Sequence, residues 1–170
     1  MNTIEIATID DVPAILELQR LAFGPQCEEL GFEDAAPMAE TLEHAYEEFA
    51  QCLMLKIQTA DGQIIGSVRG SVKDGSLYIG RLMVHPDHRQ KGLGQKLFLD
   101  IQSRLPHTRV WLCTCQQVTH TYEFYQHQGF KTYQSEEVGK GLTWVYMEKI
   151  IGGESSQKED KDGKIMMILS

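Results

Sequence analysis

Three apolar runs in the middle of the chain predict a β-meander. Residues 53–60, 64–73 and 76–84 are rich in Ile, Leu, Met and Val, and Asp61-Gly62 and Asp74-Gly75 separate them. Two-residue hairpin turns prefer Asp-Gly, because such turns need a positive φ at their central positions. We therefore expect three consecutive antiparallel strands joined by tight turns.

The residues before the meander predict a strand and a first helix. Residues 2–9 alternate and are rich in Ile and Thr, which is typical of a strand. Asp10 or Asp11 can then cap a helix that has Pro13 in its first turn. Gly24-Pro25 is expected to end this helix.

A second helix is predicted over residues 37–51. Leu42, Ala45 and Phe49 stand at i, i+3 and i+7, which places them on one apolar face. The stretch 26–36 between the two helices is acidic and contains glycine, which is typical of a loop.

The second half of the chain alternates helical and strand-like patterns. It contains an expected helix from Gly92 to Pro106, a strand over 109–115, a short helix from Thr119 to Gly129, and closing strands over 130–133 and 142–150. This order predicts the fold class α/β (α+β), with one mixed sheet flanked by about four helices. We expect a single domain over residues 1–151.

The last residues, 152–170, form a linker-like tail. Residues 152–164 are polar and of low complexity, whereas residues 165–169 are apolar. We expect the apolar end to add to an edge strand or to lie in a groove, on its own chain or on a second copy in a homodimer. The alternative is a disordered end.

Charge and composition exclude several classes of function. Lys plus Arg number 16 against 24 for Asp plus Glu, which gives a net charge of -8. This balance argues against a nucleic-acid partner, whose phosphates need cationic contacts. No stretch approaches the ~18 apolar residues of a membrane span, and the first residues lack a secretory pattern. We expect no membrane partner and a cytoplasmic location.

The four cysteines are expected to be reduced and not to hold a metal. Their spacing is irregular, and a chain of this length does not need disulfides to fold. Cys113 and Cys115 could form half of a metal site, but a C-x-C pair on an apolar strand without a second pair nearby favours core packing.

The segment 82–97, LMVHPDHRQKGLGQKL, carries the most informative pattern. A strand ends at His85-Pro86, and a turn with Gly92 and Gly94 opens a helix, whose first N–H groups have no intrahelical partner and can bind an anion. The alternative is a turn that is merely tight. The residues fit neither the P-loop nor the dinucleotide-binding pattern.

Two motifs resemble those of the GNAT superfamily of acyl-CoA-dependent N-acyltransferases. Residues 89–94, RQKGLG, match its [RQ]-x-x-G-x-[GA] motif, and Leu82-x-Val84-x-Pro86 before it also matches. Residues 124–130, FYQHQGF, resemble the L-Y-x-x-x-G-F segment of that family. The resemblance covers about residues 2–150.

The resemblance implies acetyl-CoA as co-substrate, no metal, and a sheet whose strands 76–84 and 109–115 splay apart to admit the thioester. Backbone groups of Leu82, Met83 and Val84 would bind the pantetheine arm. The pyrophosphate would lie on backbone amides of Arg89, Gln90, Lys91, Gly92, Leu93, Gly94 and Gln95. Tyr125 falls on the position that protonates the departing thiolate, and its alternative role is a core aromatic.

Two departures from the family pattern concern the cofactor and the base. Many members carry an Asn seven residues before the catalytic tyrosine, but here that position is Val118, so Thr119 or Thr121 would have to substitute. Many also carry a glutamate on the strand that corresponds to residues 77–81, which contains no carboxylate here. A water chain that ends at Glu28, Glu29 or His120 could serve as the base.

Arg69 is a candidate contact for the acceptor. Across an Asp74-Gly75 turn, Arg69 and Arg81 should point to opposite faces of the hairpin, so at most one faces the cleft. The alternative for Arg69 is an internally paired or outward guanidinium. The resemblance also places Glu28 and Glu29 at the rim of the acceptor site, where they would suit a cationic amine.

These observations together predict an N-acetyltransferase that moves an acetyl group from acetyl-CoA to a primary amine by direct attack. The acceptor would be a small molecule or a peptide. The alternative is a catalytically silent acyl-CoA-binding or regulatory module.

Overall fold

The computed structural model of the chain describes residues 2–151, which form two compact units. One unit contains residues 2–71 and 79–105, and the other contains residues 72–78 and 106–151. The seven described strands follow the hydrogen-bonded order β1-β2-β3-β4-β5-β7-β6. All described pairings are antiparallel except that of β4 with β5, so the predicted mixed, mostly antiparallel sheet is confirmed. The predicted tail, 152–170, lies outside the described residues.

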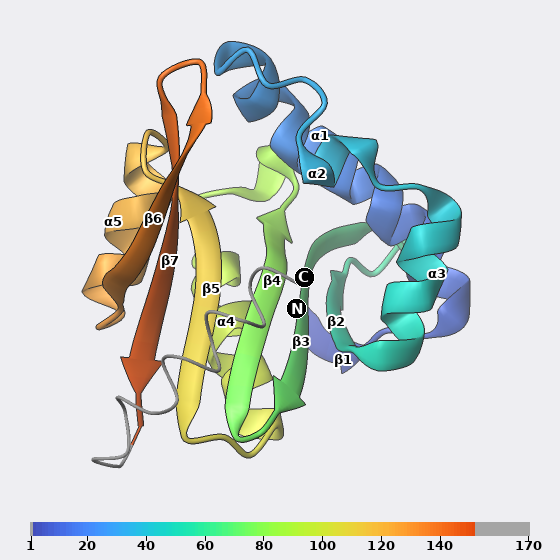
Figure 1. Ribbon diagram of the computed structural model, residues 1–170. Helices are drawn as coiled ribbons and strands as arrows, with labels where there is room; N and C mark the ends of the chain where they lie inside the picture. The colour runs from blue at the N-terminus through green and yellow to red at the C-terminus, as the bar shows by residue number, and fades with distance from the viewer. Residues whose placement is uncertain (1, 152–170) are drawn as a thin grey trace. The chain divides into compact units, whose positions relative to one another are not determined.

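The first unit contains the meander and most of the helices (Figure 1). Its elements are β1 (Thr3–Ile6), the 3-10 helix η1 (Ile9–Asp11), α1 (Val12–Glu29), α2 (Ala36–Ala39), α3 (Leu42–Gln51), β2 (Leu53–Gln58), β3 (Ile64–Lys73), β4 (Ser76–Val84), the 3-10 helix η2 (Pro86–His88) and α4 (Leu93–Arg104). The last residues of β3 and the first of β4 belong to the second unit. The Asp74-Gly75 turn occurs as predicted, with positive φ at both residues. The turn at Asp61-Gly62 is longer than the two residues expected, because β2 ends at Gln58 and β3 begins at Ile64, and only Gly62 of that pair has a positive φ.

The core of the first unit joins the first helix to the strands. Ile15, Leu18 and Ala22 of α1 form one buried cluster with Met54 of β2 and Met83 of β4. Figure 1 shows α1, α2 and α3 side by side, and α1 packs against both of the other two.

Helix α4 packs against the strands through its buried apolar stripe. Leu97 is fully buried, and a Cβ added at Gly66 of β3 would lie 3.1 Å from the Leu97 side chain. This close approach sets the position of the first half of α4 relative to β3.

The first helix does not end at Gly24-Pro25 as predicted. α1 continues through Pro25 to Glu29. An internal proline removes one helical hydrogen bond and costs about 3 kcal/mol in an isolated helix. Burial of Cys27, two residues further on, offsets part of that cost, because it extends the packed face of the helix beyond the proline.

The predicted helix over residues 37–51 is interrupted. α2 ends at Ala39, Glu40 has extended backbone angles, and α3 starts afresh at Leu42. The Thr41 side chain accepts a hydrogen bond from the His44 N–H at 3.1 Å, so Thr41 is the N-cap of α3. The break turns Glu40 into the interior.

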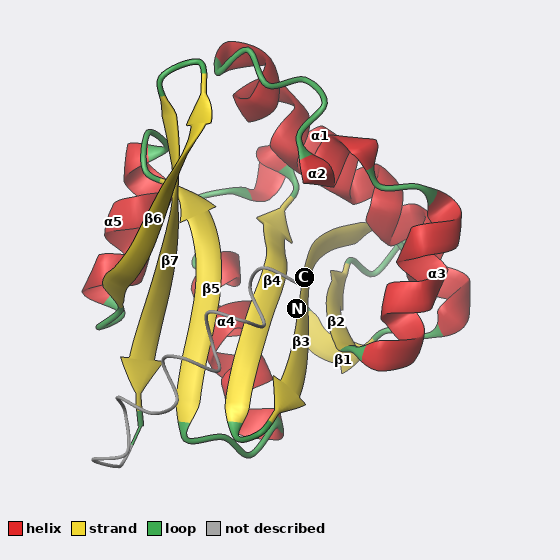
Figure 2. Cartoon of the chain, viewed as in Figure 1, coloured by secondary structure: helices red, strands yellow, loops and turns green. Residues whose placement is uncertain are grey.

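The second unit contains the C-terminal strands and one helix (Figure 2). Its elements are β5 (Arg109–Cys115), α5 (Thr119–His127), β6 (Lys131–Gly139) and β7 (Leu142–Ile150). β5 pairs with β7 along its whole length, and its parallel pairing with β4 is described for Ser76–Tyr78. The strand predicted over 130–133 extends to Gly139. Its second half is polar and lacks the alternating apolar pattern of a strand, but pairing with β7 keeps it extended.

Candidate active site

The turn before α4 presents backbone N–H groups that the helix does not use. Gly92 is the N-cap, with φ 76°, and it has no side chain to cap the helix. The Lys96 N–H donates to the Gly92 carbonyl at 3.1 Å. The N–H groups of residues 93–95 precede this first helical bond, so they are available to an anion.

The two glycines of the turn leave its surface open. A Cβ at Gly92 would meet no atom within 4 Å, and one at Gly94 would lie 3.8 Å from the Val84 side chain. The turn needs a left-handed backbone at Gly92 and also at Gln90, whose φ is 63°. The predicted cradle residues therefore form a turn at the start of α4 that is exposed except at Leu93, which is buried, and Gly94, which is half-buried.

Arg89 holds this turn against its neighbours. Its guanidinium donates to the Ala22 carbonyl of α1 at 2.9 Å and to the Val84 carbonyl of β4 at 3.5 Å. The sequence suggested that Arg89 adds positive charge to the turn. In the structure it also braces the turn to the helix and the strand on either side.

The three predicted pantetheine residues lie in the last part of β4. Met83 is buried in the core, whereas Leu82 and Val84 are half-buried. The strand leads through η2 directly into the turn, and the His85 N–H donates to the Ile65 carbonyl at 2.7 Å. Strand and turn are thus one connected surface of the first unit.

Tyr125 is a buried phenol on α5. Its side chain packs against the rings of Phe124, at 5.3 Å, and Phe130, at 6.3 Å, and the residue is 8% exposed. Burial, with a smaller contribution from Tyr78, raises the pKa of Tyr125 above its usual value. The phenol is therefore protonated at neutral pH and can donate a proton or a hydrogen bond.

The position of the missing asparagine is the N-cap of α5. Val118 is buried there, and no side chain caps the helix. Thr119, the first residue of α5, is exposed and Thr121 is half-buried. His120, one of the base candidates, is exposed on the same turn.

A buried ionic cluster in the first unit was not predicted. Glu40, with a side chain that is 1% exposed, receives hydrogen bonds from Gln19 at 2.8 Å and from Arg69 at 3.1 Å, and its Oε2 lies 2.7 Å from His44 Nδ1. Arg81 Nε lies 3.5 Å from Glu40 Oε1. We call these residues, Gln19, Glu40, His44, Arg69 and Arg81, the Glu40 cluster.

The expected orientation of the two arginines is wrong. Arg69 and Arg81 were placed on opposite faces of the hairpin, but both guanidiniums meet Glu40. The reason is the backbone of Arg81, whose φ of 50° departs from an extended strand and redirects its side chain. Arg69, offered as an acceptor contact, is 6% exposed and engaged by Glu40, which corresponds to the internally paired alternative.

Glu28 and Glu29 do not lie in a loop. They occupy the last turn of α1, because the helix continues past Pro25, and both are exposed. Exposed carboxylates at the end of α1 can attract a cationic acceptor, but the structure shows no contact of these side chains that would define a binding site.

Glu40 cannot act as a base at neutral pH. Burial alone would raise its pKa, but hydrogen bonds from Arg69, Gln19 and His44 and the charge of Arg69 together lower the pKa to about 2. The carboxylate is therefore permanently ionised, and its role is to hold positive side chains.

Replacing Glu40 with Gln is expected to lower the free energy of unfolding at pH 7 by roughly 3 kcal/mol, because it leaves buried guanidiniums without their carboxylate. The folded-state pKa is below the usual value of 4.5, so this stabilisation is complete above that pH and is lost as pH falls towards 2. Urea unfolding of wild type and variant between pH 7 and pH 2.5 measures it. Glu43→Gln, an exposed change on α3, is the control and should change stability by about 0.5 kcal/mol or less.

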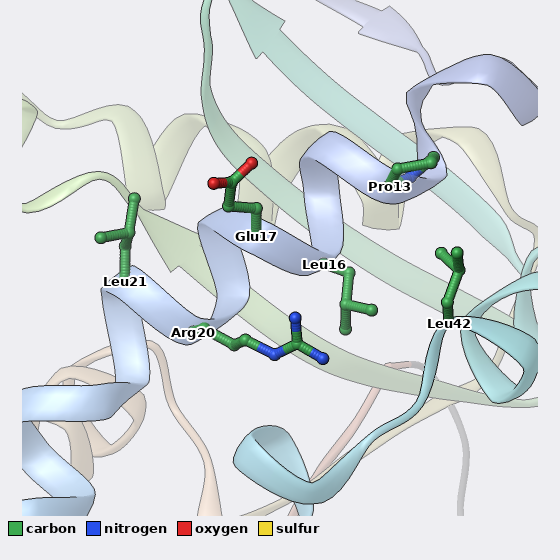
Figure 3. Close-up of a pocket in the computed structure, with 6 residues that line it drawn as sticks. All are labelled: Pro13, Leu16, Glu17, Arg20, Leu21 and Leu42. Atoms are coloured by element: carbon green, nitrogen blue, oxygen red, sulfur yellow. The ribbon is translucent and has the colours of Figure 1, made fainter.

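A pocket lies between α1 and the start of α3 (Figure 3). It is lined by Pro13, Leu16, Glu17, Arg20, Leu21 and Leu42. Its link to the Glu40 cluster is Arg20, which donates to the Glu40 carbonyl at 3.4 Å. None of the residues predicted to bind acetyl-CoA or to protonate the thiolate lines this pocket.

Neither a metal site nor a membrane helix is found in the part of the chain that the structure describes. Within residues 2–151, no three His, Cys, Asp or Glu side chains are grouped so that they could hold a metal ion. None of the helices described there is long and apolar enough to cross a membrane.

Solved structures of acetyltransferases share this fold. The PaiA N-acetyltransferase of Thermoplasma acidophilum, in complex with coenzyme A, is 20% identical with a TM-score of 0.70, over 87% of this chain and 99% of that one. The ribosomal-protein-S18-alanine N-acetyltransferase of Escherichia coli is 19% identical with a TM-score of 0.68, over 92% and 98%. A phosphinothricin acetyltransferase of Sinorhizobium meliloti, in complex with acetyl-CoA, is 15% identical with a TM-score of 0.70, over 92% and 91%.

The sequence itself places the chain in a family. No curated protein matches it significantly. The family model of the acetyltransferase (GNAT) domain, however, matches residues 24–151, a span that includes the turn before α4, Tyr125 and every member of the Glu40 cluster except Gln19. The chain therefore belongs to the GNAT acetyltransferase family.

Proposed function

We propose that this chain is an N-acetyltransferase that moves the acetyl group of acetyl-CoA to a primary amine by direct attack. The observation that carries the proposal is the open turn before α4, where a left-handed Gly92 precedes N–H groups that the helix leaves unused. Such a turn suits a pyrophosphate, because the backbone can approach phosphate oxygens without a Cβ in the way. Members of the family with known ligands, such as the Thermoplasma protein with coenzyme A, support this assignment.

The same surface would hold the rest of the co-substrate. Backbone groups of Leu82, Met83 and Val84 would pair with the pantetheine arm as an added strand, and the amides of residues 89–95 would bind the pyrophosphate. The opening of β4 from β5 beyond Tyr78 stays a prediction. The chemistry that acetyl-CoA supplies is an activated acetyl thioester.

The protein's own contribution to the transfer is proton handling. As the amine nitrogen bonds to the thioester carbonyl carbon and the C–S bond breaks, Tyr125 donates its proton to the sulfur. Its raised pKa keeps this proton in place until the thiolate forms. The acceptor ammonium must lose one proton before it can attack, since an amine of pKa about 10.4 is only ~0.04% neutral at pH 7. The nitrogen loses a second proton as the amide forms, and this proton restores the Tyr125 phenol. A water chain to Glu28, Glu29 or His120 remains the candidate route for that proton.

A covalent acetyl-enzyme on Cys52 is disfavoured, which supports direct attack. A cysteine nucleophile acts as its thiolate, and burial together with Glu48 raises the pKa of the Cys52 thiol to about 12. Cys52 is therefore a thiol at neutral pH and is unsuited to attack a thioester.

A second function, a catalytically silent acyl-CoA-binding module, is favoured by one specific observation. β4 carries no carboxylate over residues 77–81. The buried carboxylate of Glu40 contacts Arg81 of this strand, but its pKa is about 2. It therefore cannot accept the proton of an ammonium group. The presence of a protonated Tyr125 favours the enzyme over the silent module.

The proposed function is tested with acceptors that differ only in the nucleophile. Matched pairs of primary amines and alcohols are incubated with the chain and acetyl-CoA, and free thiol and acetylated product are both quantified. The proposal expects thiol release with amines and an N-acetyl product in equal amount. Release with the alcohols alone would assign another acceptor class, and binding of acetyl-CoA without release would assign the silent module.

A further inference from the structure

The Glu40 cluster contains more positive than negative charge in direct contact. Two guanidiniums, those of Arg69 and Arg81, meet the single carboxylate of Glu40. Glu48 contacts His44, at 3.6 Å, and the Cys52 thiol, at 3.3 Å, rather than either guanidinium. A neutral His44 adds no charge, and a protonated one adds a further positive charge, so the contacts leave an excess of at least one positive charge.

The carboxylate of Glu40 is fully used by its other partners. Oε1 accepts hydrogen bonds from Gln19 at 2.8 Å and Arg69 at 3.3 Å, and Oε2 accepts one from Arg69 at 3.1 Å and lies 2.7 Å from His44. A carboxylate accepts about four hydrogen bonds. Arg81 is left with an ion-pair contact at 3.5 Å and no hydrogen bond to it.

Arg81 is both partly buried and incompletely bonded. Its Nε is buried and makes no hydrogen bond, and its side chain is 21% exposed. A guanidinium has five N–H donors in a planar fork that matches a carboxylate. The exposed part of Arg81 can therefore receive an anion from solution, while Glu40 holds its buried side.

Arg81 stands at the end of the proposed acetyl-CoA surface where transfer would occur. It directly precedes Leu82–Val84, which the proposed function assigns to the pantetheine, and the pyrophosphate turn follows further along the chain. The arm would therefore run back along β4, with the thioester towards Arg81. At about 3.3 Å per residue, Arg81 is roughly 10 Å from Val84 along the strand.

We propose that Arg81 binds a carboxylate of the acceptor, so that the substrate class is a small primary amine that also carries a carboxylate, as amino acids do. Arg69 and Glu40 position Arg81 and do not touch the acceptor. This inference rests on the proposed function, because that function puts the thioester at this end of β4. It goes further by assigning the acceptor's charge and the residue that selects it.

The first experiment detects the carboxylate without any turnover. The side-chain Nε–H resonance of Arg81, assigned in ¹⁵N-labelled protein by its loss in Arg81→Lys, is followed while N-acetylglycine, N-acetyl-β-alanine or N-acetylglycinamide is added in the presence of CoA. We expect saturable shifts with at least one carboxylate probe and none with the amide. Absence of a shift with both carboxylates, or equal shifts with the amide, would overturn the assignment.

The second experiment measures selection of the acceptor. kcat/KM is determined for amino acids and for their amides, with wild type, Arg81→Gln, Arg81→Lys and the control Arg104→Gln, an exposed arginine of α4 that pairs with Asp100. We expect Arg81→Gln to lower kcat/KM for the acids by about 10- to 100-fold and for the amides by less than about threefold. For the acids, kcat/KM of Arg81→Lys should lie between the values of wild type and Arg81→Gln. The kcat/KM of Arg104→Gln should equal that of wild type.

The two proposals fail in different ways. Equal loss on acids and amides in a folded Arg81→Gln, checked by its melting temperature, would show that Arg81 only supports the structure. Thiol release with amides and no preference for acids would overturn the assignment of the acceptor and leave the N-acetyltransferase intact. No thiol release with any amine would overturn the proposed function, and the Nε titration would still decide whether Arg81 binds a carboxylate.

Discussion

Gly92→Val and Gly94→Val are each expected to abolish measurable binding of CoA. The open backbone of the turn depends on the absence of a side chain at both positions: a Cβ at Gly92 or Gly94 would meet little protein, so it would stand in the space that phosphate oxygens need. Valine at Gly92 also opposes the left-handed backbone, at a cost of about 1–2 kcal/mol. The site would lose both its shape and its exposed N–H groups.

Calorimetric titration with CoA measures this loss. Gly62→Val is a control for Gly92→Val, because Gly62 also has a positive φ, of 94°, in the turn between β2 and β3. The control should lose similar stability and keep its affinity for CoA. Wild-type affinity in a folded Gly92→Val or Gly94→Val protein would show that the cofactor lies elsewhere.

Tyr125→Phe is expected to lower kcat by roughly 10- to 10⁴-fold and to leave CoA affinity within a few-fold of wild type. The substitution removes the hydroxyl that donates to the departing sulfur, but it keeps the ring that packs against Phe124 and Phe130. Steady-state thiol release and CoA titration measure the two quantities separately.

The control for this substitution lies on the same helix. Tyr122→Phe removes a hydroxyl that lies 3.2 Å from Thr132 Oγ1 on the exposed side of α5, and it should leave kcat unchanged. An unchanged rate in Tyr125→Phe would mean that water, not the phenol, protonates the thiolate.

The sequence was sufficient to predict the structure wherever a local interaction determines the backbone conformation. The Asp74-Gly75 turn needs two positive φ values, and the chain supplies the residue types that tolerate them. The apolar stripe of α4 and its glycine N-cap are equally local, so both ends of that helix were predicted well. The turn before α4 and Tyr125 could be predicted as site residues because each belongs to a motif that is contiguous in sequence.

Prediction failed where distant contacts override a local rule. Pro25 would end an isolated helix, but α1 continues, and Cys27 beyond the proline is buried. The Glu40 cluster was missed because its members are ordinary residues at distant positions, and the positive φ of Arg81 has no signal in the sequence. Thr41, three residues before His44, is the one available sign of the helix break that turns Glu40 inwards.

A single-turnover experiment tests most directly whether the acetyl group passes from acetyl-CoA to an amine. The chain, in excess over ¹³C-acetyl-CoA, is mixed with an amine acceptor and quenched at successive times, and mass spectrometry quantifies the N-acetylated amine, free CoA and acetylated chain. The account predicts that product and CoA appear together, in equal amounts, with no acetylated chain at any time. An acetylated chain that forms and decays before product, or bound acetyl-CoA that persists unchanged, would contradict it.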